Sequence, residues 1–185
     1  MEQREIRAVY NEETIRVYQA YPENIAKEAV KLNTFGKYFK MERMTWIKPS
    51  FLWMMYRCGW AEKENQEYVL AIDIKREAFE KIVKNAVLST YQKDMGISME
   101  EWKQQIKQSD IRCQWDPERD ICGNPLDYRS IQLGLRGDAV YQYVNDWIVK
   151  IEDITEYVKE LNGKRKTKED ISGLLPKERV YLWKE

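Results

Sequence analysis

The chain has 185 residues, of which 43% are hydrophobic and 34% charged, a balance that suits one domain with a single core. Its 31 basic and 31 acidic residues cancel, which argues against strong nucleic-acid binding through overall charge but leaves open a local basic patch. There is no histidine, which excludes a Ser-His-Asp or Cys-His nucleophile and a histidine-ligated zinc ion, so any general acid or base must be Asp, Glu, Lys, Tyr or Cys.

The cysteines and the hydrophobic pattern predict a soluble, cytoplasmic protein. The cysteines Cys58, Cys113 and Cys122 are odd in number and form no C-x-x-C pair, as expected of reduced thiols. The first residues are charged, unlike a signal peptide, and no apolar run approaches the ~20 residues of a membrane span. We therefore expect neither a membrane partner nor a metal site.

The first half of the chain is predicted to begin with a β-hairpin. Residues 5–10 and 15–21 alternate as strands do, on either side of a turn. A helix with one apolar face follows from Pro22. Residues 67–74 then form a strong strand, which leads into a helix over about 76–91.

The second half mixes short helices and strands. Ser98 and Glu101 form a capping box for a helix to residue 108, and a short strand over 111–115 is broken by Asp116-Pro117. The later elements are a strand over 129–135, a helix over 138–145, a strand over 147–154, a helix over 155–161 and a solvated basic loop over 163–169. The opening hairpin and the short connections favour an α+β fold, a single domain over 1–185 with mostly antiparallel sheets and flanking helices.

Residues 43–60 carry the most informative pattern, a strand, a turn and a helix that together contain three Trp, two Arg and a Lys. Pro49 suits the first turn of a helix, and Gly59 suits its left-handed C-terminal cap. Lys48 and Ser50 would then lie beside the helix N-terminus, whose free N–H groups favour an anion. The segment predicts an anion pocket with stacking surfaces.

The spacing within this helix separates a ligand side from a core side. The two sides are Ser50, Trp53, Met54 and Arg57, and Phe51, Met55 and Cys58. Arg57 can bind a phosphate or carboxylate in bidentate fashion, and Trp53 offers a flat surface to a base. Alternatively, Trp53 belongs to the core and Arg57 to a structural ion pair.

Basic and aromatic residues interleave just before this helix. They are Lys37, Lys40, Arg43 and Lys48 with Tyr38, Phe39 and Trp46. Such interleaving suits a nucleotide or a single-stranded nucleic acid, because stacking and phosphate neutralisation combine. The alternative is that these side chains only cover a partly exposed strand.

Gln132 is the candidate on the predicted strand 129–135. It stands between Ser130 and Gly134 on one face, while Arg129 points to the other. The small neighbours leave space over its amide, which suits a hydrogen bond to a bound hydroxyl or base edge. Alternatively, Gly134 marks a bulge and Gln132 faces solvent.

Two further segments offer candidates. Asp116 and Glu118 can supply the general base that a histidine-free site needs, or Asp116 and Arg119 simply pin a turn. In the opening hairpin the candidates are Arg7, Arg16, Tyr18, Gln19 and Tyr21. Strand alternation puts Gln19 and Tyr21 on one face and Arg16 and Tyr18 on the other, and the spacing does not choose between them.

Four segments together resemble one family: 17–21, 43–57, 114–119 and 128–134. On these residues the chain is identified as a member of domain of unknown function family 4291, over nearly its whole length. The resemblance implies membership without a settled activity.

The order of elements also resembles the ADP-ribosyltransferase fold, which implies a split sheet. In that comparison residues 16–21 match the first motif, residues 45–50 the second and Gln132 the third. Many such transferases carry Glu at the third motif, and Gln can bind a ribose hydroxyl but cannot take a proton. The usual His or Arg of the first motif is represented by Arg7 or Arg16.

The leading hypothesis is a nucleotide-handling enzyme, an NAD-dependent ADP-ribosyltransferase-like transferase acting on a nucleic acid, a nucleotide or a protein. Lys48 and Arg57 would hold the diphosphate, Trp46 or Trp53 would stack on a ring, and Gln132 would fix a ribose. The expected catalytic residues are Gln132, Glu118 and Asp116. The expected cofactor-binding residues are Arg16, Gln19, Tyr21, Arg43, Trp46, Lys48, Ser50, Trp53, Arg57 and Arg129.

Two other functions remain open. One is a non-catalytic module that binds RNA or single-stranded DNA through the basic-aromatic segment 37–57. The other is a protein-interaction domain in which the surplus Trp residues form an exposed patch.

Overall fold

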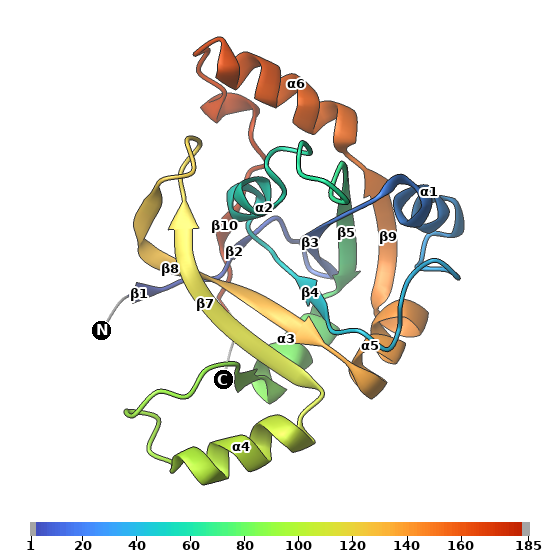
Figure 1. Cartoon of the computed structure of the whole chain (residues 1–185). Helices are drawn as coiled ribbons and strands as arrows, with labels where there is room; N and C mark the ends of the chain where they lie inside the picture. The colour runs from blue at the N-terminus through green and yellow to red at the C-terminus, as the bar shows by residue number, and fades with distance from the viewer. Residues whose placement is uncertain (1–2, 183–185) are drawn as a thin grey trace.

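Two β-sheets form the framework of the molecule, and the computed structural model describes residues 3–182 (Figure 1). The larger sheet is built on the long strand β8, which pairs antiparallel with β7 along one edge. Along its other edge, β8 pairs with β4 near one end and with β1 near the other, and β6 extends the sheet beyond β7. The strands are β1 (Gln3–Arg4), β4 (Thr45–Ile47), β6 (Val87–Leu88), β7 (Ile111–Arg119) and β8 (Pro125–Leu135).

The second sheet is antiparallel, with β5 at its centre between β3 and β9. Its strands are β3 (Thr14–Tyr21), β5 (Tyr68–Lys75) and β9 (Ile148–Asp153). A separate short pair joins β2 (Arg7–Ala8) to β10 (Arg179–Val180). The helical elements are α1 (Glu23–Leu32), α2 (Phe51–Cys58), α3 (Arg76–Asn85), α4 (Met99–Gln108), α5 (Gly137–Gln142) with a π-helix at Tyr143–Trp147, α6 (Thr155–Lys166) and a 3-10 turn at Ser172–Leu174.

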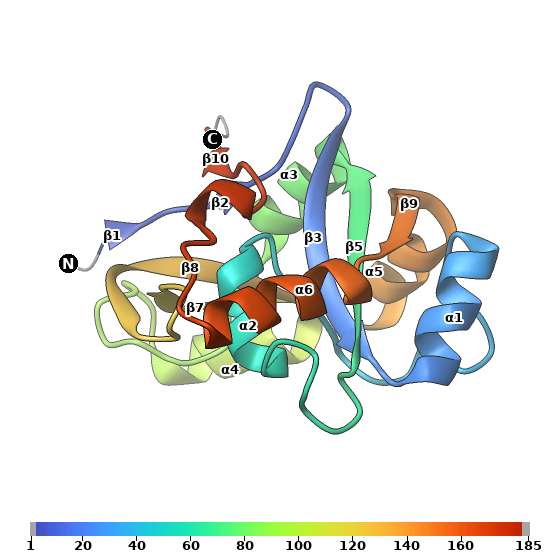
Figure 2. The same cartoon turned by 90° about the horizontal axis from the view of Figure 1, so that it is seen from above.

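The hydrophobic core lies on both faces of the β3–β5–β9 sheet. One face packs against the β7–β8 sheet and helices α1, α3 and α5, through residues such as Val17, Ile72 and Leu133. On the other face, Tyr18 and Val69 pack against α2 and α6, which cover this face together (Figure 2). The alternation of apolar side chains along β5 thus serves two cores, and the α+β class predicted from the sequence is confirmed.

Several local predictions are also confirmed. Ser98 and Glu101 form the reciprocal capping box at the start of α4. Gly59 ends α2 with φ +58°, the left-handed cap for which glycine is suited. Within residues 3–182, no helix combines the length and the apolar character needed to cross a membrane.

The opening hairpin is shorter than predicted. β3 extends over Thr14–Tyr21, but its continuous partner is β5, and the preceding segment meets it only at the bridge between Tyr10 and Ile15. The helix predicted over 76–91 ends at Asn85, because the chain then forms β6 beside β7.

The turn predicted at Asp116-Pro117 is wrong. β7 continues through both residues, which pair with Ser130 and Arg129 of β8, and a register shift follows Pro117. Proline is tolerated at such an irregularity because the lost N–H breaks no regular ladder bond. The turn lies later, where the carboxylate of Asp120 accepts the N–H of Asn124.

The basic loop predicted over 163–169 is also wrong in its first half. α6 continues to Lys166, so Lys164, Arg165 and Lys166 form its last turn. Positive charges stabilise a helix C-terminus, and Lys164 also pairs with Glu160 one turn earlier, at 2.8 Å.

Candidate functional site

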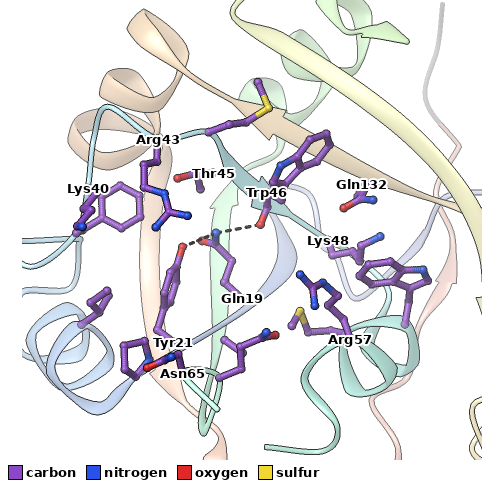
Figure 3. Close-up of a pocket in the computed structure, with 18 of the residues that line it drawn as sticks. Gln19, Tyr21, Lys40, Arg43, Thr45, Trp46, Lys48, Arg57, Asn65 and Gln132 are labelled. Carbon is purple, nitrogen blue, oxygen red and sulfur yellow. Dashed lines mark hydrogen bonds between the residues drawn. The ribbon is translucent and has the colours of Figure 1, made fainter. Parts of the chain in front are cut away.

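The main cavity lies where the two sheets meet, beside α2. At this meeting point the N–H of Tyr18 in β3 donates to the carbonyl of Lys48, just after β4, at 2.7 Å. Next to this bridge is an open cleft of about 970 Å³, lined by side chains from β3, β4, α2, β7 and β8 (Figure 3). Its size suits an organic ligand as large as a cofactor.

The charges around the cleft are unbalanced. Lys40, Arg43, Lys48 and Arg57 line it, and in the described part of the chain Asp116 is the one acidic residue that does so. Arg43 and Arg57 are exposed, and within residues 3–182 neither is paired with a carboxylate. In a chain with no net charge, this local excess of positive charge favours an anionic ligand.

Lys48 lies on the floor of the cleft with 3% of its side chain exposed. Its Nζ is 3.4 Å from Oδ2 of Asp116 and 2.8 Å from the centre of the Trp53 ring. Burial lowers the pKa of Lys48 well below its usual range, and the charge of Arg57 acts in the same direction, while Asp116 opposes the change.

Asp116 is the hub of a polar network on this floor. Nε2 of Gln114 donates to its Oδ1 at 2.8 Å, and Nε2 of Gln132 donates to its Oδ2 at 2.8 Å. Both oxygens of the Asp116 carboxylate therefore accept a hydrogen bond from an amide within the protein. Because the amide nitrogen of Gln132 is directed to Asp116, its carbonyl oxygen can accept a hydrogen bond from a ligand.

The wall opposite is held by Gln19, whose side chain is buried. Its Nε2 donates to the carbonyl of Trp46 at 3.0 Å and to the hydroxyl of Tyr21 at 2.8 Å (Figure 3). Its Oε1 accepts the hydroxyl of Tyr143 at 2.7 Å. Both ends of the Gln19 amide are therefore used within the protein. Gln19 and Tyr21 shape the cleft, and burial raises the pKa of the Tyr21 hydroxyl.

The N-terminus of α2 does not offer the open anion site that the sequence predicts. Ser50 is the N-cap: its Oγ accepts the N–H of Trp53 at 3.2 Å and donates to Oε1 of Glu118 at 2.9 Å. The N–H of Phe51 donates to Oε1 of Glu178 at 2.7 Å. The acceptor at this helix end is thus a carboxyl group of the chain itself.

Some predicted site residues lie away from the cleft. Arg16 is on the other face of β3, where it pairs with Asp73 and Glu152, each at 2.8 Å. Arg129 donates to the carbonyl of Trp115 at 3.0 Å and does not line the cleft. Ser50 and Glu118 do not line the cleft but a second cavity of about 520 Å³.

The predicted residues that the cleft brings together come from five separate segments of the chain. They are Gln19, Tyr21, Arg43, Trp46, Lys48, Trp53, Arg57, Asp116 and Gln132. The core side predicted for α2 is correct, since Phe51, Met55 and Cys58 are all buried in the second core cluster. The ladder at Gly134 is regular, so the alternative of a bulge there is wrong.

Sequence reasoning missed Gln114, Asn65 and Gln66, which also line the cleft. A signal existed for Gln114, which is two residues before Asp116 and therefore shares its strand face. Asn65 and Gln66 belong to the loop after α2, and no pattern in the sequence points to them. Within residues 3–182, no group of three or more Cys, Asp and Glu side chains is placed to hold a metal ion.

Comparison with known proteins identifies the family of the chain. No curated protein matches the chain. The family model described as Domain of unknown function (DUF4291) matches residues 5–181, nearly the whole length, and the chain therefore belongs to this family.

Proposed function

We propose that this protein is a cytoplasmic nucleotide-handling enzyme, an ADP-ribosyltransferase-like transferase that binds NAD and acts on a nucleic acid, a nucleotide or a protein. The observation that carries the proposal is the cleft itself, where four basic residues and one acidic residue surround a space of about 970 Å³. A nucleotide combines the anionic and flat groups that such a cleft can accommodate. The three unpaired cysteines are in keeping with a reducing compartment.

The two exposed arginines are the natural ligands of the diphosphate. Arg43 and Arg57 present guanidinium groups that no carboxylate within residues 3–182 engages, and guanidinium binds phosphate in bidentate fashion. Lys48, the second phosphate ligand expected from the sequence, instead packs against Trp53 and Asp116. Arg43 takes over that role in the proposal.

Gln132 and Trp46 provide the remaining contacts. The carbonyl oxygen of Gln132 accepts a ribose hydroxyl, and Asp116 holds the amide in the orientation that makes this contact. The indole of Trp46 stacks on a ring of the ligand. Gln132 and Asp116 then fix and orient the ribose, and neither removes a proton.

Isothermal titration with NAD, ADP-ribose and AMP tests the proposal. Arg57→Gln and Arg43→Gln should each weaken binding by about 10- to 100-fold, since a hydrogen bond to a charged group contributes about 1.5–3 kcal/mol. Arg4→Gln is the matched control, because Arg4 is exposed and lies outside the cleft. The absence of both heat and a thermal shift at millimolar concentrations of all three ligands would refute it.

The binding of RNA or single-stranded DNA is the alternative outcome of the same experiment. Among the aromatic residues of the basic-aromatic segment 37–57, Tyr38 and Tyr56 are exposed, but Phe39, Phe51 and Trp53 are buried, which leaves few rings for stacking successive bases. This favours a small ligand. An oligonucleotide affinity that falls steeply with salt, without any response to NAD, would support the binding module instead.

A further inference from the structure

Lys48 is a buried amine whose hydrogen bonds are incomplete. A protonated lysine has three N–H donors, and within residues 3–182 its one carboxylate partner is Asp116, at 3.4 Å. Charged pairs usually approach to about 2.7–2.9 Å. Asp116 already accepts Gln114 and Gln132 at 2.8 Å each, so its lone pairs are directed mainly to the two amides.

The charged groups that face Lys48 do not compensate for the hydration that its ammonium form loses on burial. Asp116 and Glu118 of β7 favour the ammonium form, and Arg57 of α2 opposes it. The face of the Trp53 ring, 2.8 Å from Nζ at its centre, also attracts a cation. Loss of water is the largest influence, and it lowers the pKa of Lys48 well below its usual range.

The position of Lys48 in the cleft also indicates the class of ligand that it could bind. Lys48 lines the cleft, and Figure 3 shows it beside Arg57, with Arg43 across the opening. An amine with one unpaired guanidinium group beside it and a second across the opening suits a ligand that carries an electrophilic carbon and a phosphate.

We propose that Lys48 is a nucleophile, and that the cleft takes a phosphorylated aldehyde, which Lys48 binds covalently as an imine. The nitrogen lone pair adds to the carbonyl carbon, and a C=N bond replaces the C=O bond. The carbonyl oxygen leaves as water with two protons, both supplied by the amine, so no oxidant or reductant is consumed. Arg57 and Arg43 hold the phosphate. This site goes beyond the nucleotide function and does not depend on it.

Site-resolved labelling of the whole protein tests the nucleophile. Brief pulses of formaldehyde with cyanoborohydride, at a series of pH values, methylate amines in proportion to their uncharged fraction. Lys40 is the internal reference, because it lines the same cleft and is exposed. At pH 7, mass spectrometry should find at least about tenfold more label on Lys48 than on Lys40. Equal labelling of the two lysines at pH 7 overturns the proposal.

A second probe tests the phosphate. Pyridoxal 5′-phosphate, trapped with borohydride, should label Lys48 first. Millimolar inorganic phosphate should slow this reaction but leave the formaldehyde labelling unchanged. A reaction that is insensitive to phosphate, or that prefers Lys40, overturns the ligand class.

Two variants control for position. Lys40→Met should keep the pyridoxal adduct, and Lys48→Met should lose it. Thermal denaturation of each variant checks that it folds. If Lys48→Met does not fold, the ratio of Lys48 to Lys40 label in the unchanged protein decides. The labelling is independent of nucleotide titration, so either proposal can fail while the other stands.

Discussion

Replacing Gly134 with alanine tests how closely the floor of the cleft is packed. Gly134 pairs with Trp46 across the β4–β8 ladder. A Cβ atom at position 134 would lie 2.8 Å from Sδ of Met44 and 3.0 and 3.1 Å from two carbons of the Trp46 ring. The flexible end of Met44 can move aside, but the ring is fixed to a paired strand and must shift outward.

The two contributions to stability can be compared directly. Overpacking of this kind costs about 1–3 kcal/mol, and the smaller unfolded-state entropy of alanine offsets about 0.5–1 kcal/mol of it. We therefore expect Gly134→Ala to lower the free energy of unfolding by about 1–2 kcal/mol. It should also weaken nucleotide binding, because the displaced indole lines the cleft.

Gly163→Ala is the matched control. Gly163 lies within α6, and a Cβ atom there would meet nothing within 4 Å, so the same substitution should stabilise the protein by about 0.5–1 kcal/mol. Urea unfolding followed by circular dichroism measures both variants. If Gly134→Ala proves as stable as the unchanged protein, the packing argument is refuted.

Two further substitutions, of Glu178 and of Arg16, test polar interactions outside the cleft. Burial raises the pKa of Glu178 from 4.5 to about 8, so the fold favours its protonated form, and the free energy of unfolding should fall as pH rises from about 4.5 to 8 and level off above. Glu178 keeps some solvent contact, so we expect a fall of about 2 kcal/mol, roughly half the limiting value, which Glu178→Gln should abolish in urea unfolding at pH 5, 7 and 9. Arg16→Gln breaks the bidentate pair with Asp73 and should cost about 1–2 kcal/mol in the same assay. Nucleotide affinity should be unchanged, since Arg16 lies outside the cleft; a large loss on titration would contradict its placement.

Sequence patterns succeeded where the interactions are local. The core side of α2 follows from helical spacing, and Phe51, Met55 and Cys58 are buried as predicted. The predicted ligand side is correct only in part, because Met54 belongs to the same core cluster and Ser50 does not line the cleft. The cap at Gly59 likewise depends only on backbone conformation near the helix end.

The errors arise where distant segments decide the local structure. Asp116-Pro117 has the composition of a turn, but pairing with Ser130 and Arg129 keeps it extended. The carboxyl group at the start of α2 comes from Glu178, 127 residues away from Phe51. No pattern in the sequence near α2 indicates this contact. The face of β3 that meets the cleft was equally undetermined, because alternation defines two faces and only the neighbouring strands distinguish them.

The bond from the Tyr18 N–H to the Lys48 carbonyl ties the two sheets together at the edge of the cleft. The side chain of Gln19 adds a second tie to the carbonyl of Trp46. The amide proton of Tyr18 can therefore exchange with deuterium in the solvent only when the contact between the two sheets opens. Slower exchange of this amide proton in the presence of ligand would mean that the ligand stabilises the contact between the two sheets. An unchanged rate would mean that the cleft stays open and rigid when the ligand binds.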